Sequence, residues 1–133
     1  MYSPGNVELR PEILKNRQEY IAAKLGQPAG SKPVYFVFHG GSGSPKHQIA
    51  ETLNYGAIKM NIDTDMQWAS WKGVLNFYKK NKDFLQKQLG NKNGKNIPNK
   101  KYYDPRSWIR ESQESMSKRL EKTFKDLNAF NIL

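Results

Sequence analysis

The order of apolar and polar segments predicts a strand, a helix and a second strand in the first half of the chain. The run VYFVF (34–38) is continuously apolar and rich in β-branched and aromatic residues, which is typical of a strand buried on both faces of a parallel sheet. SPKHQIAETLNYG (44–56) has the pattern of a short helix, and AIKMNI (57–62) predicts a second strand. Because such a crossover joins parallel strands, the carboxyl ends of the two strands should meet at one edge of a sheet.

Two more helices are predicted on either side of this unit. PEILKNRQEYIAAKLG (11–26) begins with a proline and ends with a glycine, as helices often do. The segment 67–89 carries apolar residues at helical spacing, with a break expected near Asn81. Its tryptophans are expected in the core.

The last third of the chain predicts a polar loop followed by a long helix. GNKNGKNIPNKK (90–101) is rich in Gly, Asn and Lys and has no periodicity. Asp104 can then cap a final helix that starts at Pro105 and carries an apolar stripe. We find no internal repeat and no linker composition, so the sequence predicts one domain of the α/β class.

The composition suits one globular domain, with 37% hydrophobic and 12% aromatic residues in 133. No stretch approaches the roughly 18 consecutive apolar residues of a membrane span, and MYSPGNVELR lacks the pattern of a secretory signal. We therefore expect a cytoplasmic protein without a membrane partner. Because the chain has no cysteine, a metal site would need imidazole, carboxylate or carbonyl ligands. Only His39 and His47 offer imidazole, and His47 is expected on the surface of a helix.

The net charge of +10 raises the question of a nucleic-acid partner. Much of the excess lies in two stretches, 79–87 and 92–101, where a solvated helix face and a loop explain it equally well. No RNA-binding aromatic motif, zinc finger or helix-turn-helix accompanies the charge. Nucleic-acid binding is therefore disfavoured, and a basic site for small phosphorylated ligands fits the same charge.

A loop of small residues, HGGSGS (39–44), follows the first predicted strand. Its glycines can adopt positive φ, so successive N–H groups can converge on an anion, and the next helix adds its positive N-terminal end. Ser42 and Ser44 add hydroxyls, and Ser44 is expected to cap that helix. A phosphate is the ligand that this pattern favours. The alternative is a flexible surface turn, because HGGSGS matches no standard nucleotide-binding motif.

His39 and the polar end of the second strand are the other candidates for chemistry. His39 can bind zinc beside the loop, or it can be a histidine bonded to backbone at the edge of the core. The stretch NIDTD places Asn61 and Asp63 after a buried strand, where such polarity is costly without partners. These two side chains can orient substrate hydroxyls and an enolate oxygen. The alternative is a cap cluster for the next helix, which satisfies Asp63 or Asp65 but not readily Asn61.

Arg106 stands in the first turn of the last predicted helix, where a cation is electrostatically disfavoured. An anion shared by the helix terminus and the guanidinium would remove the conflict. The alternative is a solvated arginine. Lys100 and Lys101 are uninformative by themselves.

Taken together, FVFHGGSGS, KMNIDTDMQWA and QLGNKNGKNIPNKKYYDPRSW closely resemble the C-terminal part of class II, zinc-dependent fructose-bisphosphate aldolases with an extended C-terminal arm. The resemblance covers residues 1–133. It implies the C-terminal portion of a TIM (β/α)₈ barrel, with residues 90–133 as a C-terminal loop and helical arm. It also implies reversible, zinc-assisted cleavage of fructose 1,6-bisphosphate to dihydroxyacetone phosphate and glyceraldehyde 3-phosphate, a step of glycolysis.

The resemblance also assigns residues. It implies that His39 is one of three histidine ligands of zinc, and that Asn61 hydrogen-bonds the enediolate, with Asp63 beside it in the catalytic set. Arg106 resembles an arginine that reaches the other phosphate from the neighbouring subunit of a homodimer, and Lys100 can assist it. A monovalent cation is implied near the glycine loop. The substrate-binding residues implied by the resemblance are Gly40, Gly41, Ser42, Asn61, Ile62, Asp63, Thr64, Lys100 and Arg106.

The family motif HG-x-Y-x-x-GNV is matched here only from Tyr2 onward. We therefore expect another zinc-ligating histidine, the remaining ligand, the catalytic aspartate and a mobile-loop glutamate to lie upstream of residue 1. One histidine cannot hold a catalytic zinc, so the isolated chain should be inactive and should tend to aggregate. Three hypotheses stay open: a piece of a longer aldolase, a non-catalytic remnant that binds phosphates or an aldolase subunit, and a nucleic-acid binder.

Overall fold

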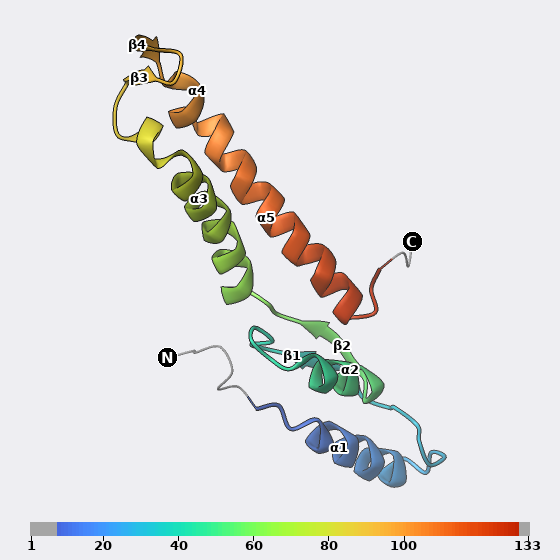
Figure 1. Ribbon diagram of the computed structural model, residues 1–133. Helices are drawn as coiled ribbons and strands as arrows, with labels where there is room; N and C mark the ends of the chain where they lie inside the picture. The colour runs from blue at the N-terminus through green and yellow to red at the C-terminus, as the bar shows by residue number, and fades with distance from the viewer. Residues whose placement is uncertain (1–7, 131–133) are drawn as a thin grey trace. The chain divides into compact units, whose positions relative to one another are not determined.

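The computed structural model describes residues 8–130, which form two compact units (Figure 1). The first unit contains residues 8–65 and 123–130, and the second contains residues 66–122. The helices and strands, in chain order, are α1 (Pro11–Lys24), β1 (Phe36–Phe38), α2 (Lys46–Asn54), β2 (Ala57–Met60), α3 (Thr64–Leu85), β3 (Leu89–Asn91), β4 (Gly94–Pro98), α4 (Lys100–Tyr103) and α5 (Pro105–Asp126).

The predicted β-α-β unit is confirmed, with β1 and β2 paired in parallel across the crossover helix α2. Phe36 lies opposite Ala57, and Phe38 lies opposite Met60. Both strands therefore end at the same edge, and the residues that follow Phe38 and Met60 leave the sheet side by side. This arrangement positions the candidate site.

The prediction that the first strand is buried on both faces is wrong for the described residues. Val37 is 49% exposed and Ile58, on the neighbouring strand, is 65% exposed, whereas Ile49 of α2 and Ala57 of β2 are buried. The physical reason is that the sheet contains only two strands within residues 8–130, and it lies against α2 on one side only. Its other face presents apolar side chains that this part of the chain does not cover.

Gln18 of α1 hydrogen-bonds the backbone just before β1 and just after α2. Its side chain is 4% exposed and donates from Nε2 to the carbonyl oxygens of Val34 (2.6 Å) and Tyr55 (2.9 Å). Its Oε1 accepts the N–H of Val34 at 3.1 Å. Because a buried amide left without partners costs free energy, these three bonds fix α1 to the start of β1 and to the end of α2.

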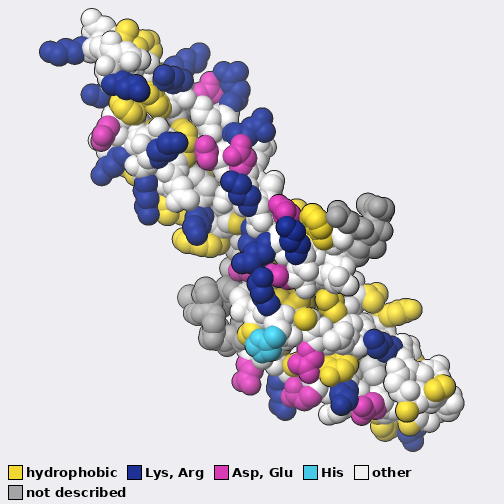
Figure 2. Space-filling view, turned by 45° about the vertical axis from the view of Figure 1, so that its right-hand side comes forward, with side chains coloured by type: hydrophobic (Ala, Val, Ile, Leu, Met, Phe, Trp, Pro, Cys, Tyr) yellow, Lys and Arg dark blue, Asp and Glu magenta, His cyan; other side chains and the backbone are white. Residues whose placement is uncertain are grey.

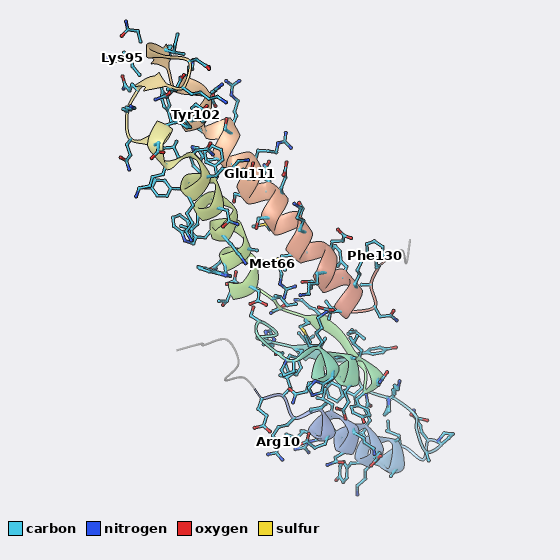
Figure 3. The ribbon with its side chains drawn as sticks, in the orientation of Figure 1. Arg10, Met66, Lys95, Tyr102, Glu111 and Phe130 are labelled. Carbon is cyan, nitrogen blue, oxygen red and sulfur yellow. The ribbon has the colours of Figure 1, made fainter. Side chains whose placement is uncertain are left out.

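In the second unit, α3 and α5 run antiparallel and approach closely through small residues. The hydroxyl of Ser70 lies 2.7 Å from that of Ser112, and the Ser115 hydroxyl donates to the carbonyl oxygen of Ala69 at 2.6 Å. Gly73 faces the backbone of Glu111, which Figure 3 labels on α5. A side chain at Gly73 would meet the carbonyl oxygen of Glu111, so this contact requires glycine.

The tryptophans of α3 do not lie in the core as expected, since Trp68 and Trp71 are 57% and 54% exposed. The spacing correctly indicated a helix with a break near Asn81. This residue has a non-helical φ of −117°, and its side-chain amide donates to the carbonyl oxygen of Phe77. However, α3 turns its small residues toward α5, and this leaves the two tryptophans at the surface of the described chain.

The segment predicted as a loop, 90–101, contains an antiparallel hairpin of β3 and β4 and the start of α4. The turn holds Lys92 and Asn93, and Gly94, with φ +148°, starts β4 directly after it. Asn99 closes the hairpin: it is fully buried and donates to the carbonyl oxygens of Lys87 and Gly90. The segment has no apolar periodicity, so its sequence pattern did not indicate the hairpin, which hydrogen bonds of asparagine side chains stabilise. Nearby, the rings of Phe84 and Tyr102 (labelled in Figure 3) stack with centroids 4.5 Å apart.

No helix among the described residues is both long enough and apolar enough to cross a bilayer.

Candidate active site at the carboxyl ends of β1 and β2

His39 and Asn61 meet where the two parallel strands end. The N–H of Asn61 donates to the carbonyl oxygen of Phe38 at 2.9 Å, which extends the strand ladder by one bond. Asn61 Nδ2 lies 2.9 Å from His39 Nδ1. The crossover geometry predicted that these two residues lie at one edge of the sheet, and the distance confirms it.

The contact between the two side chains holds the imidazole in place at the strand ends. With Nδ2 of Asn61 as donor, His39 Nδ1 is an acceptor, so the proton of the neutral ring is on Nε2. The lone pair that this tautomer offers to a cation is therefore the one that the Asn61 amide already uses. A metal ion on Nδ1 and the Asn61 amide compete for the same nitrogen.

The glycine loop packs onto the end of β2. Gly40 and Gly43 have φ of +79° and +73°, which favours glycine at both positions. Gly41 donates its N–H to the carbonyl oxygen of Asn61 at 2.8 Å, and a Cβ at Gly41 would lie 2.5 Å from the sulfur of Met60. The loop is therefore fixed to the neighbouring strand, which argues against a free surface turn.

The start of α3 holds the other side of the loop. The backbone N–H of Asp65 donates to the Ser42 hydroxyl oxygen at 3.2 Å, and the N–H of Gly43 donates to Asp65 Oδ2 at 3.4 Å. Ser42 is 5% exposed. The sequence indicated Asp65 only as a possible helix cap. Its position in the first turn of a helix that directly follows a strand end is the signal that could have indicated its contact with the glycine loop.

The backbone donors of the loop divide into two sets. The N–H groups of Gly41, Gly43 and Ser44 donate to oxygens within the chain, Ser44 to the carbonyl oxygen of Gly41 at 3.3 Å. The N–H groups of Gly40 and Ser42 have no hydrogen bond within the described residues. These two are the donors that the folded loop leaves for an anion.

Ser44 does not cap α2 as expected. Pro45 occupies the cap position, with φ −61° and ψ 136°, and no side chain bonds to the first turn of the helix. The hydroxyl oxygen of Ser44 is buried and has no hydrogen-bond partner in the described residues. Burial of an unpartnered hydroxyl is unfavourable, so the Ser44 hydroxyl is left with a hydrogen bond still to be made.

Comparison with known proteins bears on this site. Residues 1–131 match the sequence family described as "Fructose-bisphosphate aldolase class-II". The chain belongs to this family. It is 74% identical over 133 residues to the fructose-bisphosphate aldolase class 2 of Buchnera aphidicola subsp. Schizaphis graminum and 56% identical to that of Escherichia coli K12, and it covers all of its own length but 36% of each relative.

A solved structure supports the same family. The crystal structure of the fructose-bisphosphate aldolase of Campylobacter jejuni resembles this chain with a TM-score of 0.88 and 56% sequence identity, over 98% of this chain and 37% of that one. The chain thus spans little more than a third of the length of the class II aldolases that it matches.

The remaining residues of the NIDTD stretch belong to the start of α3. Asp63 and Thr64 are exposed and Ile62 is half-buried. Because α3 begins at Thr64, the polar residues after β2 lead directly into its first turn, and Asp65 of that turn contacts the glycine loop. Asp63 has an interaction within the chain.

His39 is the imidazole that the described residues place at the strand ends. Among residues 8–130 no group of three or more His, Cys, Asp or Glu side chains lies close enough to hold a metal ion. His47 is exposed on α2, as predicted. A catalytic zinc needs about three protein ligands, so the residues described here do not complete the zinc site of a class II aldolase.

Arg106 and Lys100 lie in the second unit, at the start of α5 and of α4. Arg106 donates from its backbone N–H and from Nε to Asp104 Oδ1, both at 3.0 Å, and from Nη2 to Oδ2 at 2.6 Å. The Asp104 carboxylate therefore offsets the positive charge of Arg106 at this helix terminus, and the predicted phosphate contact of Arg106 stays a prediction. Asp104 caps α5 as predicted, while the guanidinium stays 88% exposed.

A groove beside Arg106 is lined by several positively charged side chains. It encloses about 450 Å³ between α3, α4 and α5 and includes Lys80, Lys101 and Arg110. Elsewhere, Figure 2 shows Lys and Arg side chains spread over one face of the molecule with acidic side chains among them. The lysines of 79–87 and of 92–101 are all exposed, as expected of a solvated helix face and a polar loop, although the second stretch contains a hairpin.

The ion pair between Arg106 and Asp104 at the start of α5 predicts that its stabilising contribution is lost at low pH. The Arg106 side chain, and then its backbone N–H, lower the pKa of Asp104 from 3.8 to about 2. Because the folded pKa lies below the ordinary one, this stabilisation is complete above about pH 4 and is lost as the pH falls through about 2. The ¹³C shift of the Asp104 carboxyl should titrate near pH 2, and Arg106→Gln should move the midpoint back toward 3.8. A midpoint near 4 in the unsubstituted chain would contradict the pairing.

Proposed function

We propose that this chain supplies the C-terminal part of a class II fructose-bisphosphate aldolase, which cleaves fructose 1,6-bisphosphate reversibly to dihydroxyacetone phosphate and glyceraldehyde 3-phosphate. The observation that carries the proposal is the contact of His39 with Asn61 beside a glycine loop that retains free N–H donors. An imidazole, an amide and an anion-binding loop at the carboxyl ends of parallel strands are what a phosphorylated carbonyl substrate requires.

The loop and the start of α3 would bind the phosphate of dihydroxyacetone phosphate. Gly40 and Ser42 offer backbone N–H groups, and Gly41 allows the backbone to approach the strand. The first turn of α3, with Ile62, Asp63 and Thr64 leading into it, adds its dipole. A monovalent cation beside this loop would offset the phosphate charge.

Asn61 and Asp63 would act on the carbon skeleton of the substrate. The Asn61 amide can donate to an oxygen that gains negative charge as the enediolate forms, and Asp63 can orient substrate hydroxyls. Zinc, when bound through His39, would polarise the substrate carbonyl. The described residues hold one ligand, and we propose that the others come from the part of the family's length that residues 1–133 do not span.

The same proposal covers architecture and partners. In the complete enzyme, β1 and β2 would be two neighbouring strands of a TIM (β/α)₈ barrel in the cytoplasm, and residues 90–133 would form the helical arm. The exposed apolar face around Val37 and Ile58 is the surface that such a barrel would cover. Arg106, assisted by Lys100, would reach the second phosphate in the neighbouring subunit of a homodimer.

One observation favours a second candidate, a remnant that binds phosphate or an aldolase subunit without catalysis. The observation is that no group of three metal-ligating side chains lies together among residues 8–130, and the one imidazole at the strand ends cannot hold a catalytic zinc. The free donors of the loop do not depend on zinc, so phosphate binding could persist without cleavage.

A chimera separates the two candidates. The 133-residue chain would replace the matching C-terminal 36% of the Escherichia coli relative, so that the rest of the aldolase is present. We expect this chimera to cleave fructose 1,6-bisphosphate and to lose that activity with a zinc chelator, whereas the chain alone should show none. A chimera that folds, as judged by circular dichroism and sedimentation, but does not cleave the substrate would contradict the aldolase proposal and favour the remnant.

A further inference from the structure

We propose that Asp65 is a positioning residue that sets which N–H groups of the glycine loop face a phosphate. This inference rests on the proposed function of the loop and adds the residue that controls it. Asp65 is the second residue of α3 and contacts the loop in two ways, through its carboxylate and through its backbone N–H.

The two contacts are reciprocal. The side chain of Asp65 accepts the N–H of Gly43, and the side chain of Ser42 accepts the N–H of Asp65. A residue of the loop and a residue of the helix each satisfy a backbone donor of the other segment, in the manner of a capping box but between segments distant in sequence. The loop is therefore fixed to α3 on one side, as Gly41 fixes it to β2 on the other.

The carboxylate matters because the loop alone cannot hold this conformation. Three of its residues, Gly40, Gly41 and Gly43, are glycines, which have the largest backbone freedom to lose on ordering. With Asp65 in place, the N–H groups of Gly41 and Gly43 are both occupied, and those of Gly40 and Ser42 are left for a ligand. Without the acceptor oxygen, Gly43 would be released and the free donors would lose their fixed arrangement.

The role requires a hydrogen-bond acceptor rather than a negative charge. A carboxylate near a phosphate would repel it, but the charge of Asp65 lies in the first turn of α3, where the helix dipole favours it. Asparagine at this position keeps an acceptor oxygen and removes the charge, and alanine removes both. The pair Asp65→Asn and Asp65→Ala therefore separates the two contributions.

The test uses the active chimera with Asp65→Ala, Asp65→Asn and, as a matched control, Asp83→Ala, an exposed acid on the same helix. For Asp65→Ala we expect KM for fructose 1,6-bisphosphate and the inhibition constant of inorganic phosphate to rise about tenfold, with kcat changed less than about threefold. Asp65→Asn should remain within about threefold of the unsubstituted chimera on all three quantities, as should the control. A fall in kcat at unchanged KM would indicate loss of folded enzyme and would overturn the proposal.

A second measurement does not depend on catalysis. Hydrogen–deuterium exchange of a peptide that covers the loop should be faster in Asp65→Ala and nearly unchanged in Asp65→Asn and Asp83→Ala. Unchanged exchange in Asp65→Ala would overturn the positioning role even if the enzyme were active. An inactive chimera with faster exchange in Asp65→Ala would instead count against the aldolase function and leave the role of Asp65 in the loop supported.

Discussion

Substitution of His39 by alanine should lower kcat/KM of the chimera for fructose 1,6-bisphosphate by about a thousandfold or more, which corresponds to about 4 kcal/mol of transition-state stabilisation. The physical reason is that His39 is the imidazole at the strand ends and is bonded to Asn61. Its loss would remove the imidazole that we propose as a metal ligand. The measurement is a steady-state assay of cleavage together with the zinc content of the purified protein.

The control for this prediction is His47→Ala. His47 is the second histidine of the chain and is exposed on α2. Its removal should leave zinc content and kcat/KM within about twofold of the unsubstituted chimera, as expected of a surface substitution. Equal zinc content in the His39→Ala protein, or equal losses from both substitutions, would contradict the assignment of His39 as ligand.

The largest expected effect on stability is that of Gly73→Ala. A methyl group at Gly73 would lie 2.8 Å from the carbonyl carbon of Glu111 and 2.9 Å from the Cα of Ser112, so backbone atoms would have to move. Overpacking of this kind costs about 3 kcal/mol, while alanine in place of glycine gains about 1 kcal/mol of helix propensity. We therefore expect the free energy of unfolding to fall by about 2 kcal/mol, measured by urea denaturation of the chimera.

The neighbouring exposed residue provides the comparison for Gly73. Lys72→Ala changes the same helix by a residue that faces solvent, so its effect should stay within about 0.5 kcal/mol. If Gly73→Ala proved as stable as Lys72→Ala, the close approach of α3 and α5 would be wrong.

The sequence indicated the core of the site because one strong constraint acts there. A parallel β-α-β crossover leaves both strand ends at one edge, and this alone brought His39 and Asn61 together. The support around them was harder to infer. The link between Asp65 and Gly43 depends on where α3 begins to within one residue, and helix ends are the least certain part of a pattern.

The second unit shows two different limits of pattern reasoning. The periodicity of α3 identified the helix, but it could not tell that the face of Ala69 and Gly73 would be chosen over the tryptophan face to meet α5. The hairpin has polar residues on both faces, so no alternation marks its strands, and Asn99 holds it together instead. The role of Arg106 toward a neighbouring subunit stays a prediction.

The closed hairpin between β3 and β4 has a practical consequence. Its turn at Lys92 and Asn93 is exposed, while the buried Asn99 hydrogen-bonds the base of the hairpin. Exposed tips of this kind tolerate inserted residues. A short peptide tag or a fluorophore introduced at the tip would therefore be carried on an ordered support, without any change to the sequence of the glycine loop.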